Sequence, residues 1–288
     1  MRQRGFLFIS IASAMFGLGT VLAKILGEAF NPFFVSWLSL LCGGMLVSAC
    51  QLARRKPLLP RLTRSSWIDL LLLASIGTAM PLLCVVEGMA QASAITGNFL
   101  LQAQGPAAII LAMLFLREKM VWKQIAGIAL LIIGSLLVIV RDLHGPLQIQ
   151  GGQGDLLVLL AAVGLGFSYI PSKRLAKYGD ALQIILLRLF VGSLLILPFV
   201  PFQTYILLVP LTIALIGWLA LYIVSSFGLG YLFQQMGLER LQAWESAALM
   251  QTLPLFGTAF ALLILHESLT PLQIVGGCIV LLGGLLVI

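Results

Sequence analysis

The chain contains 288 residues, of which 60% are apolar and only 9% are charged, and its mean hydropathy is +1.09. Soluble domains carry roughly 25% charged residues, so this chain has too few polar groups to cover a surface in contact with water. The composition therefore excludes a soluble enzyme, a disordered chain and a nucleic-acid-binding protein. The net charge of +7 comes from short basic clusters between apolar runs, a pattern typical of membrane orientation signals.

Ten apolar runs are long enough to cross a membrane as helices, because the ~30 Å hydrocarbon layer requires about 20 apolar residues per span. In chain order the predicted spans are Gly5–Ala23, Phe33–Ala53, Trp67–Met89, Ala94–Leu116, Val121–Val140, Leu156–Lys173, Ala181–Val200, Pro210–Met236, Ala243–Leu265 and Thr270–Ile288. The sequence therefore predicts an all-α integral membrane protein with ten transmembrane helices.

The distribution of basic residues predicts the direction of the chain, because these residues stay on the cytoplasmic side in short loops. With a cytoplasmic N-terminus, Lys24 and Arg141 lie outside and Arg188 lies within a span. The other fourteen lie on the cytoplasmic side: Arg2, Arg4, Arg54, Arg55, Lys56, Arg61, Arg64, Arg117, Lys119, Lys123, Lys173, Arg174, Lys177 and Arg240. Ten spans place the C-terminus on the same side, and the cytoplasmic (inner) membrane is the expected location.

The second half of the chain repeats the first at a constant offset of 149 residues. Residues 94–139 align with residues 243–288 without a gap, and fifteen of these 46 positions are identical, Gln102/Gln251 and Glu118/Glu267 among them. The chain is therefore predicted to contain two five-helix repeats, residues 1–140 and 156–288, joined by residues 141–155. Because five is odd, the second repeat enters the membrane from the opposite side, which gives the inverted repeat found in many secondary transporters.

A duplication is also compatible with a large helix bundle that transports nothing, in which the matched glycines only allow close packing. An inverted pair has a further consequence, because an exchange of conformations between the repeats converts an inward-open state into an outward-open one. We therefore expect transport. We also expect the halves to superpose after an inverting two-fold rotation, with spans five and ten at the periphery.

The ends of spans four and nine carry a motif that occurs twice. It reads Phe-Leu-Arg-Glu-Lys-Met-Val-Trp-Lys-Gln-Ile-Ala-Gly from Phe115 and Ile-Leu-His-Glu-Ser-Leu-Thr-Pro-Leu-Gln-Ile-Val-Gly-Gly from Ile264. This pair of segments resembles the repeated signature of the drug/metabolite transporter superfamily, EamA-like branch. The resemblance covers the full chain and implies ten spans, two inverted halves, cytoplasmic termini and amino-acid efflux as the commonest role. The chain departs from the family pattern at Phe16-Gly17, where Trp is commoner, and at Ser39, where arginine is frequent, so no single substrate is carried over.

Polar residues inside the spans are the candidate solute-binding residues. Asn98 and Gln102 lie one turn apart on one face of span four, whereas Trp244 and Gln251 share a face of span nine. Carboxamides near the bilayer centre either join helices through hydrogen bonds or line a solute pathway, and both interpretations stay open. The further candidates are Thr20 in span one, Tyr169 in span six, and Tyr231 and Gln235 in span eight.

Charged groups in or near the spans each have a structural and a functional interpretation. Arg188 needs acceptors within the membrane, and we favour a clamp onto backbone carbonyls, or snorkelling of the side chain to the interface, over binding of an anionic substrate group. The functional interpretation of Glu118 and Glu267 is proton coupling, and we favour the structural one, in which the N–H groups at the start of the next helix hold both carboxylates. If protons are the coupling ion, Glu87 in span three is the candidate because partial burial favours its protonated form, with a hydrated interfacial carboxylate as the alternative.

These features predict a secondary transporter that moves a small polar or amphipathic metabolite by alternating access, with amino-acid or metabolite efflux as the leading function. The expected partners are the lipid bilayer, a small-molecule solute and protons as a candidate coupling ion. No cofactor, metal or catalytic site is expected, because the four cysteines and two histidines are scattered and an enzyme needs a nucleophile with its base or a metal cluster. The alternatives are a lipid or drug flippase or exporter, and an uptake carrier for nucleotide-like metabolites.

Overall fold

In the part of the chain that the computed structural model describes, the regular secondary structure is helical, apart from one isolated β-bridge between Phe30 and Leu207. This part comprises residues 2–55, 57–60, 62–92, 94–116, 121–139, 152–203, 205–266 and 270–287. Helices suit such an apolar chain because a membrane offers no water to backbone N–H and C=O groups, which must then pair within the segment. The helical elements are α1 (Arg2–Ala29), α2 (Pro32–Ala53), α3 (Arg64–Ala74), η1 (Ser75–Ala79), α4 (Met80–Gln91), α5 (Ala94–Leu100), η2 (Leu101–Ala103), α6 (Gln104–Leu116), α7 (Trp122–Ile139), α8 (Gln153–Leu175), α9 (Ala181–Ile196), η3 (Leu197–Phe202), α10 (Ile213–Tyr222), η4 (Ile223–Gly230), α11 (Tyr231–Leu238), α12 (Ala243–Leu249), η5 (Met250–Thr252), α13 (Leu253–Ile264) and α14 (Pro271–Val287).

Polar residues determine where several helices begin. Asn31 caps α2 by accepting a hydrogen bond from the backbone N–H two residues further on at 2.9 Å, and Pro32 occupies the first turn, where no N–H is needed. Thr212 accepts a hydrogen bond from a backbone N–H of the first turn of α10 at 3.2 Å. Asp180 and Gln183 form a capping box at the start of α9. These caps shift the starts of α2 and α10 by one to three residues from the limits of the predicted apolar runs.

Seven helical segments within the described residues are long and apolar enough to cross a membrane. They are Gln3–Ala29, Pro32–Ala53, Arg64–Gln91, Thr96–Phe115, Gln153–Leu175, Ala181–Phe202 and Ile213–Leu238. These segments agree with the prediction of an all-helical, multi-pass membrane protein. Helices α7, α12, α13 and α14 cover the other predicted spans but are not among the seven, so the count of ten spans stays a prediction.

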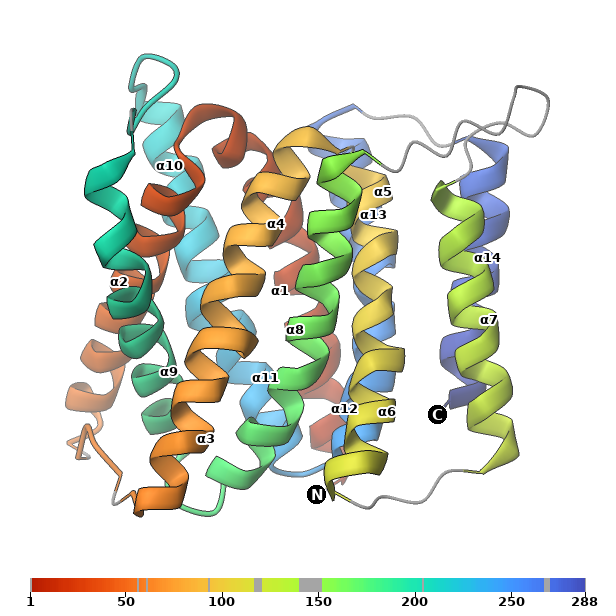
Figure 1. Cartoon of the computed structure of the whole chain (residues 1–288), viewed down its shortest axis with the longest axis horizontal. Helices are drawn as coiled ribbons and strands as arrows, with labels where there is room; N and C mark the ends of the chain where they lie inside the picture. The colour runs from red at the N-terminus through yellow and green to blue at the C-terminus, as the bar shows by residue number, and fades with distance from the viewer. Residues whose placement is uncertain are drawn as a thin grey trace.

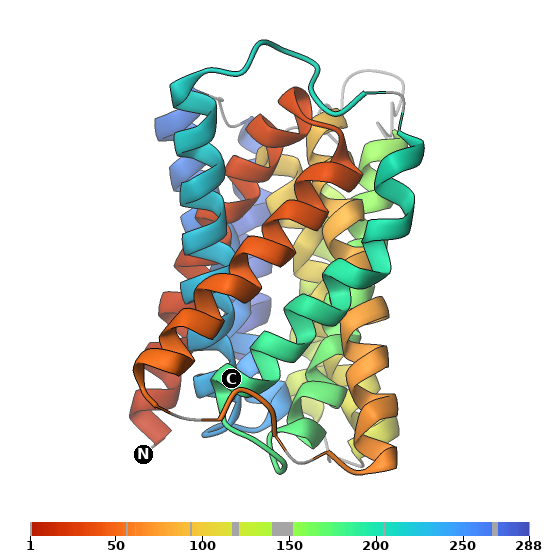
Figure 2. The ribbon, with the colours of Figure 1, turned by 90° about the vertical axis from the view of Figure 1, so that its left-hand side faces the viewer.

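The helices run side by side, and the chain turns at the two ends of the bundle (Figure 1). Helices α7 and α14 pack against each other at one edge, in the peripheral place predicted for spans five and ten. Helices α2 and α9 pack together near the opposite edge, where both cross the bundle obliquely (Figure 2). The remaining helices form the centre between these two pairs.

Equivalent residues of the two halves make equivalent contacts. Lys24 Nζ donates a hydrogen bond to the carbonyl of Ala92 at 2.8 Å, and Lys173 Nζ donates to the carbonyl of Leu241. Each residue of the second contact lies 149 positions after its counterpart in the first. Leu241 also contacts Gly5 near the start of α1, so the end of α8 lies beside the start of α1 and the two helices run in opposite directions.

Two glycine pairs repeat this relationship. A Cβ atom on Gly88 would lie 2.8 Å from the carbonyl oxygen of Gly154, and one on Gly237 would lie 3.3 Å from that of Gly5. Both distances are shorter than ordinary van der Waals contacts, so these helices approach as closely as only glycine permits. The two pairs are again related by the offset of 149.

Each half also contains a π-helix at an equivalent position. The offset of 149 places η1 on residues 224–228, which lie within η4. Pi-helices are rare and occur frequently at functional sites. Here they interrupt the predicted spans three and eight.

Candidate functional site

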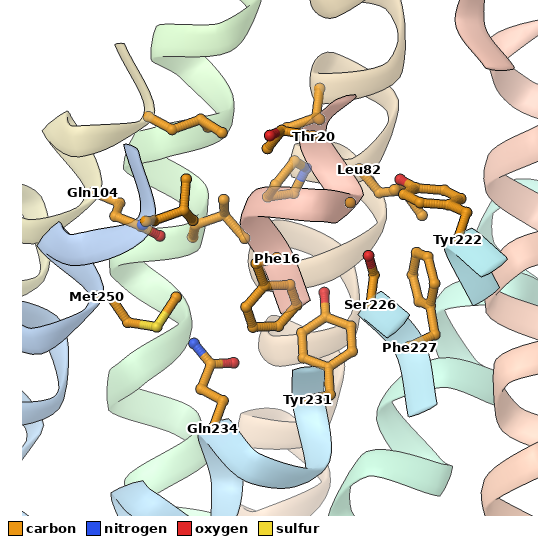
Figure 3. Close-up of a pocket in the computed structure, with 16 residues that line it drawn as sticks. Phe16, Thr20, Leu82, Gln104, Tyr222, Ser226, Phe227, Tyr231, Gln234 and Met250 are labelled. Atoms are coloured by element: carbon orange, nitrogen blue, oxygen red, sulfur yellow. The ribbon is translucent and has the colours of Figure 1, made fainter. Parts of the chain in front are cut away.

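A cavity of about 640 Å³, including the part that is open to the outside, lies between the two halves (Figure 3). The first half contributes residues of α1, α4 and the segment from η2 to α6. The second half contributes residues of α8, of the segment from α10 to α11 and of the segment from η5 to α13. The offset of 149 relates these segments pairwise, so three equivalent segments of each half line the cavity. Small-molecule sites commonly lie at such interfaces between domains or repeats.

Aromatic side chains form one wall of the cavity. The rings of Phe16 and Tyr231 meet edge-on with their centroids 5.2 Å apart. Phe227 meets Tyr231 at 5.8 Å and Tyr222 at 5.3 Å, also in edge-on geometry, which is a favourable arrangement for aromatic rings. The wider turn of the π-helix η4, with hydrogen bonds from i to i+5, brings Tyr222, Ser226, Phe227 and Tyr231 to the same side (Figure 3).

Arg188 of α9 lies behind this wall and is 4% exposed. Its Nε donates a hydrogen bond to Oγ1 of Thr78 at 2.6 Å, and its Nη2 donates to the carbonyl of Gly77 at 2.8 Å. Pro81, four residues after Gly77, has no N–H for that carbonyl, so Arg188 supplies a donor there. The guanidinium carbon also lies 4.1 Å from the centroid of the Tyr231 ring. The predicted clamp of Arg188 onto a backbone carbonyl is therefore confirmed.

Several polar groups of the cavity have no partner among the described residues. The Nε2 atom of Gln104 and the Oγ atom of Ser226 are buried without a hydrogen bond. The hydroxyls of Tyr222 and Tyr231 also form no hydrogen bond with the residues that the structure describes. Because buried polar groups are normally paired, these four groups are available to a ligand.

Two of the nine predicted site residues, Thr20 and Tyr231, line the cavity. The Thr20 hydroxyl lies 2.8 Å from the carbonyl oxygen of Gly17 and is hydrogen-bonded to Oδ1 of Asn98. This contact joins α1 to α5. Asn98 is completely buried, and its Nδ2 has no partner among the described residues, but it is not among the residues that line the cavity.

Three other predicted residues are buried beside the cavity without lining it. Gln102 lies in η2, and Gln235 lies on α11. The hydroxyl of Tyr169, on α8, accepts a hydrogen bond from Nε2 of Gln234 at 3.4 Å. Since Gln234 does line the cavity, Tyr169 contacts the site through this neighbour.

The remaining predicted residues lie at the ends of helices or outside the described part. Trp244 is half-buried near the start of α12, and its Nε1 donates to Gln242 at 2.5 Å. Glu87 is half-buried near the end of α4, where its carboxylate accepts a hydrogen bond from Gln91 at 2.5 Å. The side chain of Gln251 lies outside the described residues, as do Glu118 and Glu267.

Gln104 and Gln234 line the cavity, although the sequence pattern favoured their near neighbours Gln102 and Gln235. The reason is helical phase, because a 3₁₀ turn such as η2 and a π-helix such as η4 rotate the following residues relative to a regular α-helix. Ser226 and Tyr222 also line the cavity and were not among the predicted residues. The serine and glycine residues within η4 were the available signal for an irregular helix.

The described residues contain no group of three or more His, Cys, Asp or Glu side chains that could hold a metal ion. Cys42, Cys50, Cys84 and Cys278 are free thiols. The lining of the cavity is mostly apolar, and within the described residues it contains no Asp, Glu, Lys or Arg.

Comparisons with known proteins agree with a transport function. A model of the EamA-like transporter family matches residues 3–140 and 152–288. A protein of Methanothermobacter thermautotrophicus named as an uncharacterized transporter is 25% identical over 98% of this chain and 85% of its own length. A probable amino-acid metabolite efflux pump of Salmonella typhimurium is 29% identical over 65% of this chain and 64% of its own length. A solved crystal structure shares the fold with a TM-score of 0.73 and 15% identity, covering 99% of this chain and 96% of that one.

Proposed function

Since the chain belongs to the EamA-like transporter family, we propose that it exports a small amino-acid-like metabolite across the cytoplasmic membrane. The members of this family are multi-pass membrane transporters and not enzymes. The proposed architecture has ten spans in two inverted repeats, with both termini in the cytoplasm. The substrate class rests on the name of the relative from Salmonella typhimurium, a probable amino-acid metabolite efflux pump. The match covers 64% of that relative, so its activity comes to this chain only as a proposal.

The observation that carries this proposal is the position of the cavity. Equivalent segments of the two halves enclose it, and Lys24 and Lys173 make equivalent contacts in those halves. Helices α1 and α8 run in opposite directions, as an inverted repeat requires. In such an arrangement an exchange of conformations between the halves moves the opening of a central site from one membrane face to the other.

Proton coupling through Glu87 is a separate part of the proposal. The Glu87 side chain is half-buried and bonded to Gln91, and it does not line the cavity among the described residues. A coupling role would therefore act through movement of α4 and not through contact with the solute. Glu87→Gln in proteoliposomes with an imposed pH gradient tests this role, since unchanged gradient-driven accumulation would exclude it.

Counterflow in proteoliposomes tests the transport function. Vesicles loaded with unlabelled L-leucine, L-phenylalanine or L-tryptophan should accumulate the same labelled amino acid from outside, and vesicles without the protein should not. Counterflow of lipid or nucleotide-like solutes in place of amino acids would favour the alternative classes, and the absence of any counterflow would contradict the proposal.

A matched pair of substitutions on the predicted span three tests whether the solute uses this cavity. Leu82 is buried and lines the cavity, whereas Leu71 is 50% exposed on the outer surface. Leu82→Trp should fill the cavity and abolish counterflow, while Leu71→Trp should leave it unchanged. Equal effects of the two substitutions would place the solute pathway elsewhere.

A further inference from the structure

The charge of Arg188 is not neutralised within the described part of the protein. Its partners are the hydroxyl of Thr78, the carbonyl of Gly77 and the ring of Tyr231, and all three are uncharged. No carboxylate of the described residues lies within ion-pair distance of its guanidinium. Arginine stays protonated in proteins, and a charged residue within a membrane span generally indicates a functional site.

The positive potential of Arg188 extends to the cavity through Tyr231. The guanidinium lies over one face of the Tyr231 ring at 4.1 Å, and the hydroxyl of that ring points into the cavity (Figure 3). Electrostatic interactions are weakly screened in such a low-dielectric surrounding. The positive charge against the ring face therefore favours a negatively charged group near the hydroxyl end of Tyr231.

Two other side chains of the cavity carry unpaired polar groups. Ser226 is 5% exposed, its Oγ has no partner among the described residues, and it lies between Tyr231 and Tyr222 (Figure 3). Gln104 is 3% exposed and presents an unpaired Nε2 from the opposite side of the cavity. The site thus combines hydroxyl and amide donors with an unneutralised positive charge and no acidic lining residue among those described.

We propose that this cluster of donors binds the carboxylate of the transported solute, with Tyr231 and Ser226 as direct contacts and Arg188 as a positioning residue behind Tyr231. The inference rests on the proposed transport function and names its substrate class, an amphipathic carboxylate. The apolar part of the solute packs against Leu82, Val85, Met250 and Leu253. Charge-assisted hydrogen bonds are the stronger class, whereas a ligand that carries only a positive charge would be repelled by Arg188, with no carboxylate among the described lining residues to offset that repulsion.

Ligand-dependent thermal unfolding of the purified chain in detergent tests this preference without relying on transport. The probes are leucine, phenylalanine and tryptophan, their amides, and 3-phenylpropionate and phenethylamine, each at millimolar concentration. At least one amino acid should raise the Tm, 3-phenylpropionate should do so as well, and the amides and phenethylamine should not. Equal stabilisation by an acid and its amide would overturn the proposal, as would the absence of stabilisation by every carboxylate.

Substitutions then separate the electrostatic role of the cluster from a structural one. Tyr231→Phe keeps the ring over Arg188 and should weaken carboxylate binding about tenfold, the usual effect of losing one hydrogen bond to a charged group. Tyr178→Phe, on a tyrosine that is 41% exposed, is the matched control and should change nothing. Unchanged affinity in Tyr231→Phe would contradict the assignment.

Arg188→Gln removes the charge, whereas Thr78→Val removes one hydrogen bond of Arg188 and keeps the charge. We expect the preference for acid over amide to disappear in Arg188→Gln and to persist in Thr78→Val. Equal loss in both variants would reduce Arg188 to a structural clamp. If Arg188→Gln fails to fold, Ser226→Ala with Tyr231→Phe still tests the site, since together they should abolish acid binding.

The two proposals fail in distinguishable ways. Carboxylate binding without counterflow of any solute would overturn the transport function and leave the site assignment in place. Counterflow of amides or amines as fast as that of the acids would overturn the site assignment and leave the transport function in place.

Discussion

The two π-helices occupy equivalent positions in the two halves, but the neighbouring helix holds each of them in a different way. At η1 the contact is polar, because Arg188 of α9 donates hydrogen bonds to two residues of the π-helix. At η4 the contact is steric, because a Cβ atom on Gly43 of α2 would lie only 2.5 Å from Cβ of Phe227. The counterpart of Arg188 is Ser39, whose hydroxyl is buried without a partner among the described residues.

Both halves therefore contain a π-helix, but the contact that stabilises the π-helix differs between them. Hydrogen bonds tolerate small shifts of the two helices, whereas a close-packed contact is lost only when the helices separate. We therefore expect α2 and η4 to move as one body, and we expect the contact between α9 and η1 to respond to the solute.

The largest effect on stability is expected at the close-packed contact between α2 and η4. Gly43→Ala should cost about 3 kcal/mol of unfolding free energy, because overpacking forces the backbone of η4 to shift. Its counterpart Gly192→Ala should cost less, since the nearest atom to a new Cβ is Cδ1 at the end of the Leu40 side chain, 3.2 Å away. Denaturant titration in detergent measures both free energies of unfolding. Similar losses of stability would contradict the distinction between the α2–η4 and α9–η1 contacts.

An intermediate effect on stability is expected at the hydrogen-bonded contact between α9 and η1. Thr78→Val keeps the shape of the side chain but leaves Nε of Arg188 unpaired, which should cost about 2 kcal/mol. Thr258→Val is the control, because the buried Thr258 hydroxyl has no partner among the described residues, and its loss should be neutral or stabilising. Denaturant titration compares the free energies of unfolding of the two variants. An unchanged value for Thr78→Val would show that Arg188 does not stabilise η1.

The smallest effect is expected at the matched lysines. Lys173 Nζ donates to the carbonyls of Leu238 and Leu241, whereas Lys24 Nζ donates to the carbonyl of Ala92 and lies 3.8 Å from Oε1 of Glu28. The Glu28 side chain is exposed, and an ion pair with an exposed partner contributes little. Lys173→Met should therefore cost about 2 kcal/mol and Lys24→Met about 1 kcal/mol. The midpoints of thermal unfolding should fall in the same order, and the reverse order would mean that other contacts dominate at these positions.

Apolar runs in the sequence were sufficient to place most helices, since hydrophobicity alone selects segments of membrane-spanning length. Span four was predicted as Ala94–Leu116, which is where α5, η2 and α6 lie. Helix α1 extends to Ala29, beyond the predicted end at Ala23, and Lys24 within this extension donates a hydrogen bond to the carbonyl of Ala92. A contact across the fold of this kind leaves no local signal.

The candidate site was only partly predictable for a related reason. Thr20 and Tyr231 were identified as polar residues inside spans, and both line the cavity. Gln104 and Gln234 were missed because the prediction assumed regular α-helices, whereas η2 and η4 alter the phase of the residues that follow. Local helix irregularities depend on tertiary contacts such as that between Gly43 and Phe227, and hydrophobic periodicity does not report them.

The central claim is that the cavity opens in turn to each side of the membrane. A single cysteine at Val85, a buried cavity residue, tests it in a chain whose four native cysteines are replaced by alanine. A membrane-impermeant thiol reagent is applied to right-side-out and to inverted vesicles, with and without L-phenylalanine. We predict reaction from both faces and a change in both rates when the amino acid binds, whereas reaction from one face only would contradict alternating access.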